Sequence, residues 1–221
     1  LICFALADAF YFGVLSSRIH AIWALESGGT LEDRPIYTKS RIFDPFPFPD
    51  PAEDLKADIR AAAEELDALR KARLAEHPGL TLTQMYNVLE KLRDRAALTP
   101  EEERIRAQGA VLLLKELHER LDRLVFRAYG WPGTLSDEEI LARLVDLNRE
   151  RAAEERRGQV RWLRPDYQMQ RAGIAAPKAE QIEAELVLTL AKGAAAKAQK
   201  PAFPRHAREQ TAAVMAALLP A

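Results

Sequence analysis

The pattern of apolar and polar positions changes near residue 50. Before that point apolar residues are dense, and five recur at three- and four-residue spacings: Phe12, Leu15, Ile19, Ile22 and Trp23. This spacing predicts one helix from about Asp8, which would cap its start, to Ser27, with Gly28 and Gly29 ending it.

Two short strands are predicted in the same part of the chain. Residues 1–6, LICFAL, form an apolar run bounded by Asp8, which is typical of a buried strand. Residues 36–43, IYTKSRIF, alternate in part between apolar and polar positions, and this favours a second strand.

From Asp50 onward the chain is rich in Ala, Leu, Glu and Arg, which are strong helix formers. Helix starts are indicated at Asp50-Pro51, Thr99-Pro100 and Ser136. The predicted helices cover residues 50–77, 83–94, 99–129, 136–157, 178–190 and 205–219. Residues 159–174 are predicted to be irregular and residues 191–205 to form a mobile linker. The predicted fold class is mainly α, a helical bundle with a small α/β remnant at the N-terminus.

The amino-acid composition narrows the possible locations and partners of the chain but does not indicate a function. The 221 residues include 32 Lys plus Arg and 33 Asp plus Glu, a formal net charge of -1, so any DNA contact must come from a local basic patch. Cys3 is the only cysteine, which excludes an internal disulfide and favours a cytoplasmic location.

Residues 1–15 are interrupted by Asp8 and fall short of the roughly 20 residues that span a bilayer, so no membrane contact is predicted. The start at Leu1, without a charged segment before it, favours a fragment over a signal peptide.

No catalytic constellation is visible. The sequence lacks a glycine-rich phosphate-binding loop and a GxSxG nucleophile motif, and its four histidines are far apart: His20, His77, His118 and His206. The carboxylates are typical of solvated helix faces. We therefore predict no catalytic, cofactor-binding or metal-binding residue within the chain.

The most distinctive stretch is SRIFDPFPFPD, residues 40–50, in which three prolines alternate with aromatic residues. Each proline fixes its own φ and keeps the preceding residue out of the α region, so the segment should be extended. Phe43, Phe46 and Phe48 could then pack on a neighbouring core. A strap between two domains is the favoured interpretation, because the PxxP spacing of exposed proline-rich ligands is absent.

Polar clusters supply the candidate DNA contacts. Residues 37–41 place Tyr37, Lys39 and Arg41 close together, and such side chains contact phosphates and base edges. Arg18 lies beside two serines, and residues 160–167, VRWLRPDY, contain Arg161 and Arg164. For residues 37–41 and Arg18 an ordinary polar loop is the more common explanation, and residues 160–167 are equally typical of a helix-packing turn.

Several of these stretches together resemble a known family. The segments FGVLSSRIHAIWALESGG, PIYTKSRIFDPFPFPD, LTLTQMYNVLEKLR and YGWPGTLSDEEILARLVDLNRERAAEE are similar to the C-terminal part of large DNA methyltransferases of the type IIG restriction–modification kind, and VRWLRPDYQ continues the match. The resemblance covers most of the chain to about Tyr167 and returns weakly near the end.

The resemblance implies a parent enzyme that methylates adenine in duplex DNA with S-adenosylmethionine, and that uses Mg²⁺ if it also cleaves. It implies that residues 1–49 end a target recognition domain, which the strap joins to a helical region of residues 50–221. Within this chain the implied DNA-binding residues are Arg18, Tyr37, Lys39, Arg41, Arg161 and Arg164. The implied partners are double-stranded DNA and, within the parent, the methyltransferase domain.

The chain itself departs from the complete family pattern. The Asn-Pro-Pro-Tyr type methylation motif, the cofactor-binding glycine motif and the nuclease signature do not occur in the 221 residues. The fragment alone should therefore carry no cofactor and no activity. A helical protein-interaction or assembly module without a nucleic-acid role is the alternative hypothesis, and the near-neutral charge suits it.

Overall fold

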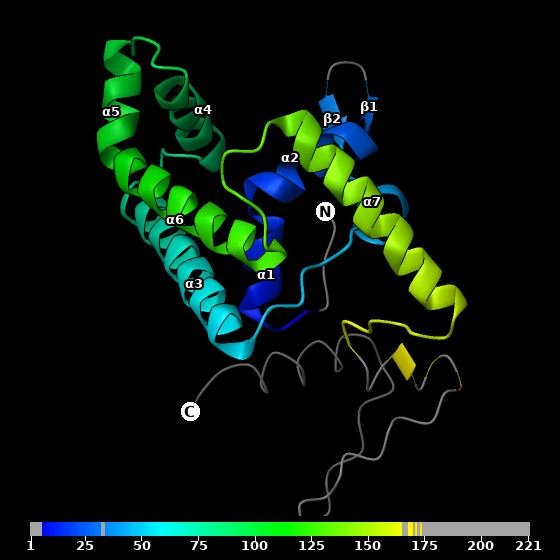
Figure 1. Cartoon of the computed structure of the whole chain (residues 1–221). Helices are drawn as coiled ribbons and strands as arrows, with labels where there is room; N and C mark the ends of the chain where they lie inside the picture. Colours follow the sequence, from blue (N-terminus) through cyan, green and yellow to red (C-terminus); the bar gives the residue numbers. More distant parts are fainter. Residues whose placement is uncertain (1–5, 32–33, 165–167, 170, 172, 174–221) are drawn as a thin grey trace, which may run out of the picture. The chain divides into compact units, whose positions relative to one another are not determined.

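The chain is mainly helical, as predicted. A computed structural model describes residues 6–31, 34–164, 168–169, 171 and 173. Along the chain the elements are α1 (Ala9–Leu15), α2 (Arg18–Ser27), β1 (Gly29–Leu31), β2 (Arg34–Ile36), the π-helical η1 (Lys39–Phe43), α3 (Glu53–Glu76), α4 (Leu82–Arg93), α5 (Pro100–Gln108), α6 (Val111–Tyr129) and α7 (Asp137–Arg156) (Figure 1). The strands of the described part form a two-stranded antiparallel ribbon in which Gly29 lies opposite Ile36.

The first predicted helix is interrupted. Asp8 does cap α1, because its side chain accepts a hydrogen bond from the Phe10 N–H at 2.8 Å. The helix nevertheless ends before Ser16 and restarts at Arg18. The Ser17 hydroxyl donates to the Val14 carbonyl, and the Arg18 N–H donates to Asp122 Oδ1 at 2.7 Å. Side-chain bonds of this kind compete with the helical ladder, so the prediction of one continuous helix was wrong.

The predicted helix over residues 99–129 is also two helices. Its cap is confirmed, because Thr99 and Glu102 form a reciprocal capping box at the start of α5. The break falls at Gly109–Ala110, where Ala110 has a φ of 46°. A Cβ on Gly109 would lie 2.9 Å from Met85 Cγ, so glycine allows the close approach of α4 at this point.

The predicted strand over residues 36–43 was wrong. β2 ends at Ile36, and Lys39–Phe43 form η1. The Trp23 indole N–H donates to the Ile42 carbonyl at 2.8 Å, and Ile42 is buried. This anchor stabilises a helical turn where the partial alternation indicated an extended chain.

The other predicted boundaries hold within a few residues. α3 begins at Glu53, after Ala52, so Asp50 does not cap it and instead pairs with Lys56 at 3.0 Å. α4 and α7 both begin with a capping box, at Thr81 and at Ser136. Between residues 159 and 173, helical structure is described at 168–169 and 171. The predicted strand at 1–6, the helices at 178–190 and 205–219 and the linker at 191–205 lie wholly or almost wholly outside the described residues.

One hydrophobic core joins the residues before and after Pro49. α1 packs on α3 and α6, while α4 and α5 cover another part of α6 (Figure 1). A Cβ on Gly13 would lie 2.8 Å from Ile59 Cγ2, which shows how closely α1 approaches α3. The compact unit Leu1–Ala175 therefore contains both sides of the strap. The assignment of residues 1–49 to a recognition domain stays a prediction.

The proline–aromatic segment is a core element. Phe46 and Phe48 are buried, as expected, and their rings meet edge to face at 5.0 Å. Its carbonyls are satisfied by side chains from two helices, because the Tyr129 hydroxyl donates to Pro47 O at 3.0 Å and the Asn148 amide donates to Pro45 O. The segment thus fastens α6 and α7 to the N-terminal helices.

Candidate nucleic-acid interface

The predicted contacts at residues 37–41 fall on η1 and the residues that lead into it. The turn follows the β1–β2 ribbon in the chain, and the hydrogen bond from the Trp23 indole to the Ile42 carbonyl holds the turn on α2. Lys39, Ser40 and Arg41 are exposed. η1 is therefore a short, anchored turn that presents two cations to solvent.

The two cations differ in their partners. Lys39 Nζ lies 2.5 and 2.8 Å from the two carboxylate oxygens of Asp44, and its side chain is 69% exposed. A pair this exposed contributes about 0–1 kcal/mol, so a phosphate can compete for Lys39. Arg41 makes no hydrogen bond or ion pair with any residue that the structure describes. Of the predicted residues, Arg41 is therefore the one whose charge has no partner within the described part of the chain.

Tyr37 supports this turn from inside. Its hydroxyl lies 3.0 Å from His20 Nε2, and the His20 ring packs edge to face against Phe46. Burial raises the pKa of Tyr37 to about 12 and lowers the pKa of His20 to about 4. Both groups are therefore neutral at pH 7, and the pair joins η1 to α2 without adding charge.

Arg18 lies at a junction between helices. Its guanidinium lies 2.5 Å from Asp137 Oδ1 and donates to the Leu135 carbonyl at 3.3 Å. These contacts tie the start of α2 to the start of α7. The DNA contact expected of Arg18 stays a prediction, and any phosphate would have to displace Asp137.

Arg161 and Arg164 follow α7. Arg161 donates to both oxygens of Glu154, at 2.8 and 3.1 Å, and lies 3.4 Å from Asp50 Oδ2. Arg164 is exposed, and its backbone N–H donates to Gln168 Oε1 at 2.6 Å. The six predicted residues thus lie on three parts of the fold: Tyr37, Lys39 and Arg41 on and before η1, Arg18 at the start of α2, and Arg161 and Arg164 after α7.

The carboxylate partners were missed by sequence reasoning. Asp44 is five residues from Lys39 and Glu154 is seven from Arg161, so short-range spacing carried a signal for both pairs. Asp137 is 119 residues from Arg18, and no local pattern could reveal that contact.

A groove of about 820 Å³ lies along the strap, with Tyr11, Phe43 and Phe48 in its lining. On the wall of the groove, the Arg60 guanidinium donates to both carboxylate oxygens of Asp8 at 2.8 Å. These hydrogen bonds lower the pKa of Asp8. The groove's four lining cations are all ion-paired: Lys56, Arg60, Arg151 and Arg161. The groove therefore offers aromatic surface but no free charge for a phosphate.

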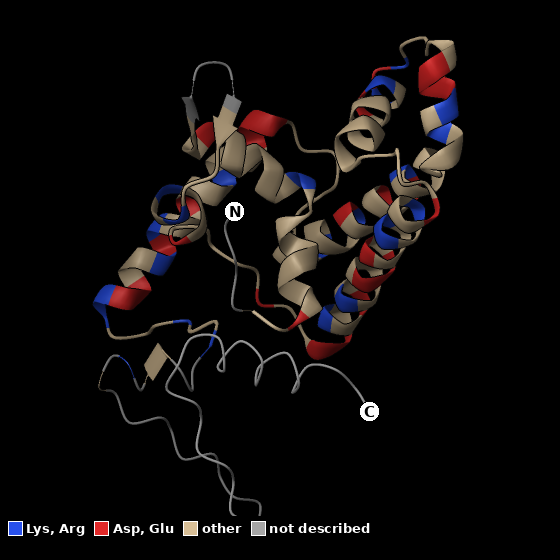
Figure 2. Cartoon of the chain, turned by 180° about the vertical axis from the view of Figure 1, so that it is seen from behind, with Lys and Arg blue, Asp and Glu red and all other residues tan. Residues whose placement is uncertain are grey.

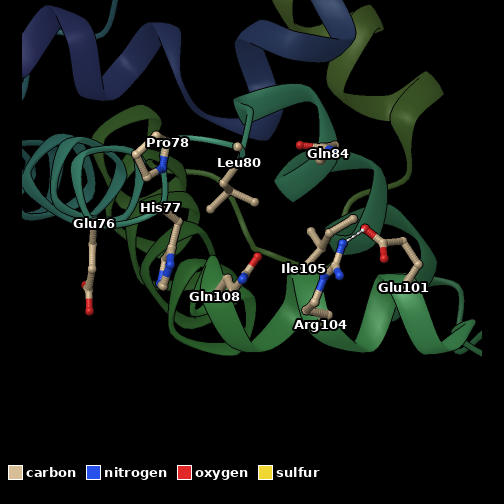
Figure 3. Close-up of a pocket in the computed structure, with 10 residues that line it drawn as sticks. Glu76, His77, Pro78, Leu80, Gln84, Glu101, Arg104, Ile105 and Gln108 are labelled. Atoms are coloured by element: carbon tan, nitrogen blue, oxygen red, sulfur yellow. Dashed lines mark hydrogen bonds and ion pairs between the residues drawn. The ribbon is translucent and has the colours of Figure 1, made fainter.

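A smaller hollow of about 290 Å³ lies where α3, α4 and α5 meet (Figure 3). Arg104 and Glu101 on its wall are paired at 2.6 Å, and Glu76 and His77 contribute from the end of α3. Within the described part of the chain, no group of three or more His, Cys, Asp or Glu side chains is placed to hold a metal ion.

A partly buried polar cluster joins four helices. Tyr86 Oη lies 2.7 Å from His118 Nε2, and the Arg70 guanidinium lies 5.7 Å from the Phe12 ring centroid and 5.2 Å from that of Tyr86. Burial, and then the nearby arginines, lowers the pKa of His118 to about 4. These contacts hold α1, α3, α4 and α6 together.

None of the described helices combines the length and apolar character needed to cross a membrane. Acidic and basic positions are interspersed along the ribbons of the longer helices (Figure 2).

Comparison with known proteins supports a relationship to DNA-modifying enzymes. No family model matches the chain. The chain is 31% identical over 144 residues, 65% of its length, to DNA methyltransferase A of Bacillus subtilis (strain 168), of which the match spans 14%. It also resembles a solved structure of the Type IIL restriction-modification enzyme MmeI in complex with DNA, with a TM-score of 0.50 and 26% identity over 65% of this chain and 16% of that one. The resemblance to DNA methyltransferases of restriction–modification systems is thereby confirmed, for a chain that is short relative to both proteins.

Proposed function

We propose that these 221 residues are the C-terminal DNA-recognition and scaffold part of a restriction–modification DNA methyltransferase that acts on adenine. The observation that carries the proposal is the 31% identity over 144 residues to a DNA methyltransferase. A likeness to an enzyme whose structure contains DNA supports it further. Such an enzyme would act on double-stranded DNA in the cytoplasm.

In this proposal the chain positions DNA and the rest of the enzyme performs the chemistry. A base that is methylated must leave the duplex, and the flanking duplex must be held while it does so. Arg41 and Lys39, on an anchored turn, suit contacts with the phosphate backbone. The buried strap keeps that turn fixed to the helical bundle, so that the bundle is a scaffold for it.

S-adenosylmethionine would supply the methyl group, but the described residues do not fit it. The larger groove contains no glycine in its lining, and its cations already pair with carboxylates. Close backbone approach at glycine is how nucleotide-like cofactors are commonly held. We assign cofactor binding, and any Mg²⁺ needed for cleavage, to other parts of the enzyme, together with the methyltransferase domain that this chain would contact.

The alternative of a pure protein-interaction module has less support. The most exposed large apolar side chains of α2, α4 and α6 are Leu25, Leu82, Leu112 and Leu113. A docking face requires a contiguous apolar patch, and these four side chains, which come from three helices, do not by themselves establish one.

The test is DNA binding by the enzyme that contains this chain. Arg41→Gln should weaken binding of a fluorescein-labelled duplex and reduce the slope of log K against log salt by about 0.9, the value for one phosphate contact. Arg104→Gln removes the same charge from an exposed residue of α5 that is paired with Glu101, and it should leave binding unchanged. Equal affinities and equal slopes for the Arg41 variant and the wild type would show that Arg41 does not contact DNA.

A further inference from the structure

The second half of α7 and the segment after it are rich in arginine. Residues 143–164 contain seven arginines and four acidic residues, and no lysine, in a chain whose formal net charge is -1. The first turn of α7 is acidic by contrast, with Asp137, Glu138 and Glu139. Figure 2 shows basic residues recurring along α7 and into the segment that follows.

Three of these arginines are available to a partner. Arg156 and Arg157 are exposed and form no side-chain hydrogen bond or ion pair with residues in the described ranges. Arg149 is 75% exposed, and its partner Asp146, at 3.1 Å, is 70% exposed. Such a pair is weak, so a phosphate can replace Asp146 as the partner of Arg149. Arg151 and Arg161, in contrast, are both held by Glu154.

The packing of α7 decides which way these side chains face. Asn148 binds the Pro45 carbonyl, and Arg151 and Glu154 line the groove beside the strap. Arg149 and Arg156 are seven residues apart, which places them on one face of the helix about 10.5 Å apart along its axis. Arg157 is adjacent to that face. Because Pro45 closely follows η1, this face and Arg41 belong to neighbouring parts of the fold.

We propose that this arginine face of α7, formed by Arg149, Arg156 and Arg157, is a second contact surface for the phosphate backbone of duplex DNA. The inference rests on the proposed function, since it requires an enzyme that binds DNA. Arginine presents a planar fork of donors that matches phosphate geometry, and its guanidinium is weakly hydrated. Contacts of this kind position a protein on the duplex without reading its sequence.

A purely local explanation accounts for only part of the pattern. Cations near a helix C-terminus stabilise the helix dipole, and this effect covers Arg156 and Arg157. It falls off within the last turn, so it does not explain Arg149, two turns earlier. An acidic protein surface would also attract these charges. DNA is favoured because the similar restriction–modification enzyme was solved with DNA.

The test compares two triple variants of the enzyme that contains this chain. Arg149→Gln/Arg156→Gln/Arg157→Gln removes two charges from α7 and one from its C-cap residue. The control, Lys71→Gln/Arg104→Gln/Arg106→Gln, removes three charges from α3 and α5, where each residue pairs with a carboxylate. Binding of labelled mixed-sequence duplexes is measured by anisotropy between about 50 and 200 mM salt, the range over which phosphate contacts change affinity strongly.

The α7 variant should bind at least tenfold more weakly at low salt, equally on unrelated sequences, with a salt slope reduced by up to about 2.7. The control should match the wild type. Arg149→Lys/Arg156→Lys/Arg157→Lys keeps the charge and should retain most of the salt slope. Circular dichroism of each variant verifies that the enzyme keeps the overall helix content of the wild type.

Two outcomes would overturn the inference while leaving the proposed function intact. One is an α7 variant that binds like the wild type; the other is a control that weakens binding as much as the α7 variant does. Unchanged DNA binding with loss of a bound acidic protein would reassign the face to that protein. A folded wild-type enzyme that binds no duplex would instead contradict the proposed function itself.

Discussion

Replacing Phe46 with alanine tests whether the proline–aromatic segment is a core element or a loose connection. Phe46 is 5% exposed, and its ring lies 4.5 Å from that of His20, 5.0 Å from that of Phe48 and 6.2 Å from that of Trp23. The substitution removes a buried ring and leaves a cavity bounded by these groups. Truncations of buried phenylalanine cost about 3–5 kcal/mol.

The assay is urea unfolding of the 221-residue chain, followed by circular dichroism. A loss of 3–5 kcal/mol is a large share of the roughly 5–15 kcal/mol that stabilises a typical domain, so the midpoint should fall clearly at an unchanged m-value. Phe12→Ala is the matched control, because Phe12 is 36% exposed and should lose much less. A cost for Phe46→Ala below about 1 kcal/mol, in the range of surface substitutions, would refute the buried strap.

Two further predictions concern the contacts around this core. Tyr129→Phe removes the donor to the Pro47 carbonyl, and leaving that buried acceptor unpaired should cost about 1–3 kcal/mol in the same unfolding assay; an unchanged midpoint would mean that the bond contributes nothing. His20 and His118 have a pKa of about 4 when folded, against 6.5 ordinarily, so the unfolded chain takes up protons first as pH falls. Stability should therefore be full above pH 6.5 and decline between pH 6.5 and 4, by about 1–2 kcal/mol per histidine at pH 5. Unfolding measured at pH 7 and pH 5 checks this, and a His20→Gln/His118→Gln variant should show a smaller decline.

Helix identity was predictable because it depends on local signals. The sequence predicts helix caps at Asp8, Thr99 and Ser136, and each cap is present in the structure. The breaks within two predicted helices were not predictable in this way. They depend on Asp122, which reaches Arg18 from another helix, and on the approach of Met85 to Gly109. Tertiary contacts of this kind override local propensity.

For the strap, too, the local conformation was predictable from the sequence, whereas its position in the fold was not. Alternating proline and phenylalanine predicted an extended segment with rings facing a core, and Phe46 and Phe48 are buried. That the segment lies within one compact unit depends on Tyr129 and Asn148, about 80 and 100 residues away.

The candidate interface was predictable only in part. Residue type singled out Arg18, Lys39 and Arg161, but the structure gives each of them a carboxylate partner. Residue type cannot reveal whether a cation is already paired, because the partner is set by the fold. Arg41 is left as the clearest candidate of the original six.

We propose that this chain belongs to an adenine-specific DNA methyltransferase of a restriction–modification system. The most direct measurement is transfer of labelled methyl groups from S-adenosylmethionine to duplex DNA by the protein expressed from the complete reading frame that contains these residues. We expect label in N6-methyladenine of the DNA, with less transfer at elevated salt in the Arg41→Gln variant than in the wild type. A folded protein that transfers no methyl group to DNA would contradict the claim, and label on cytosine alone would contradict its adenine specificity.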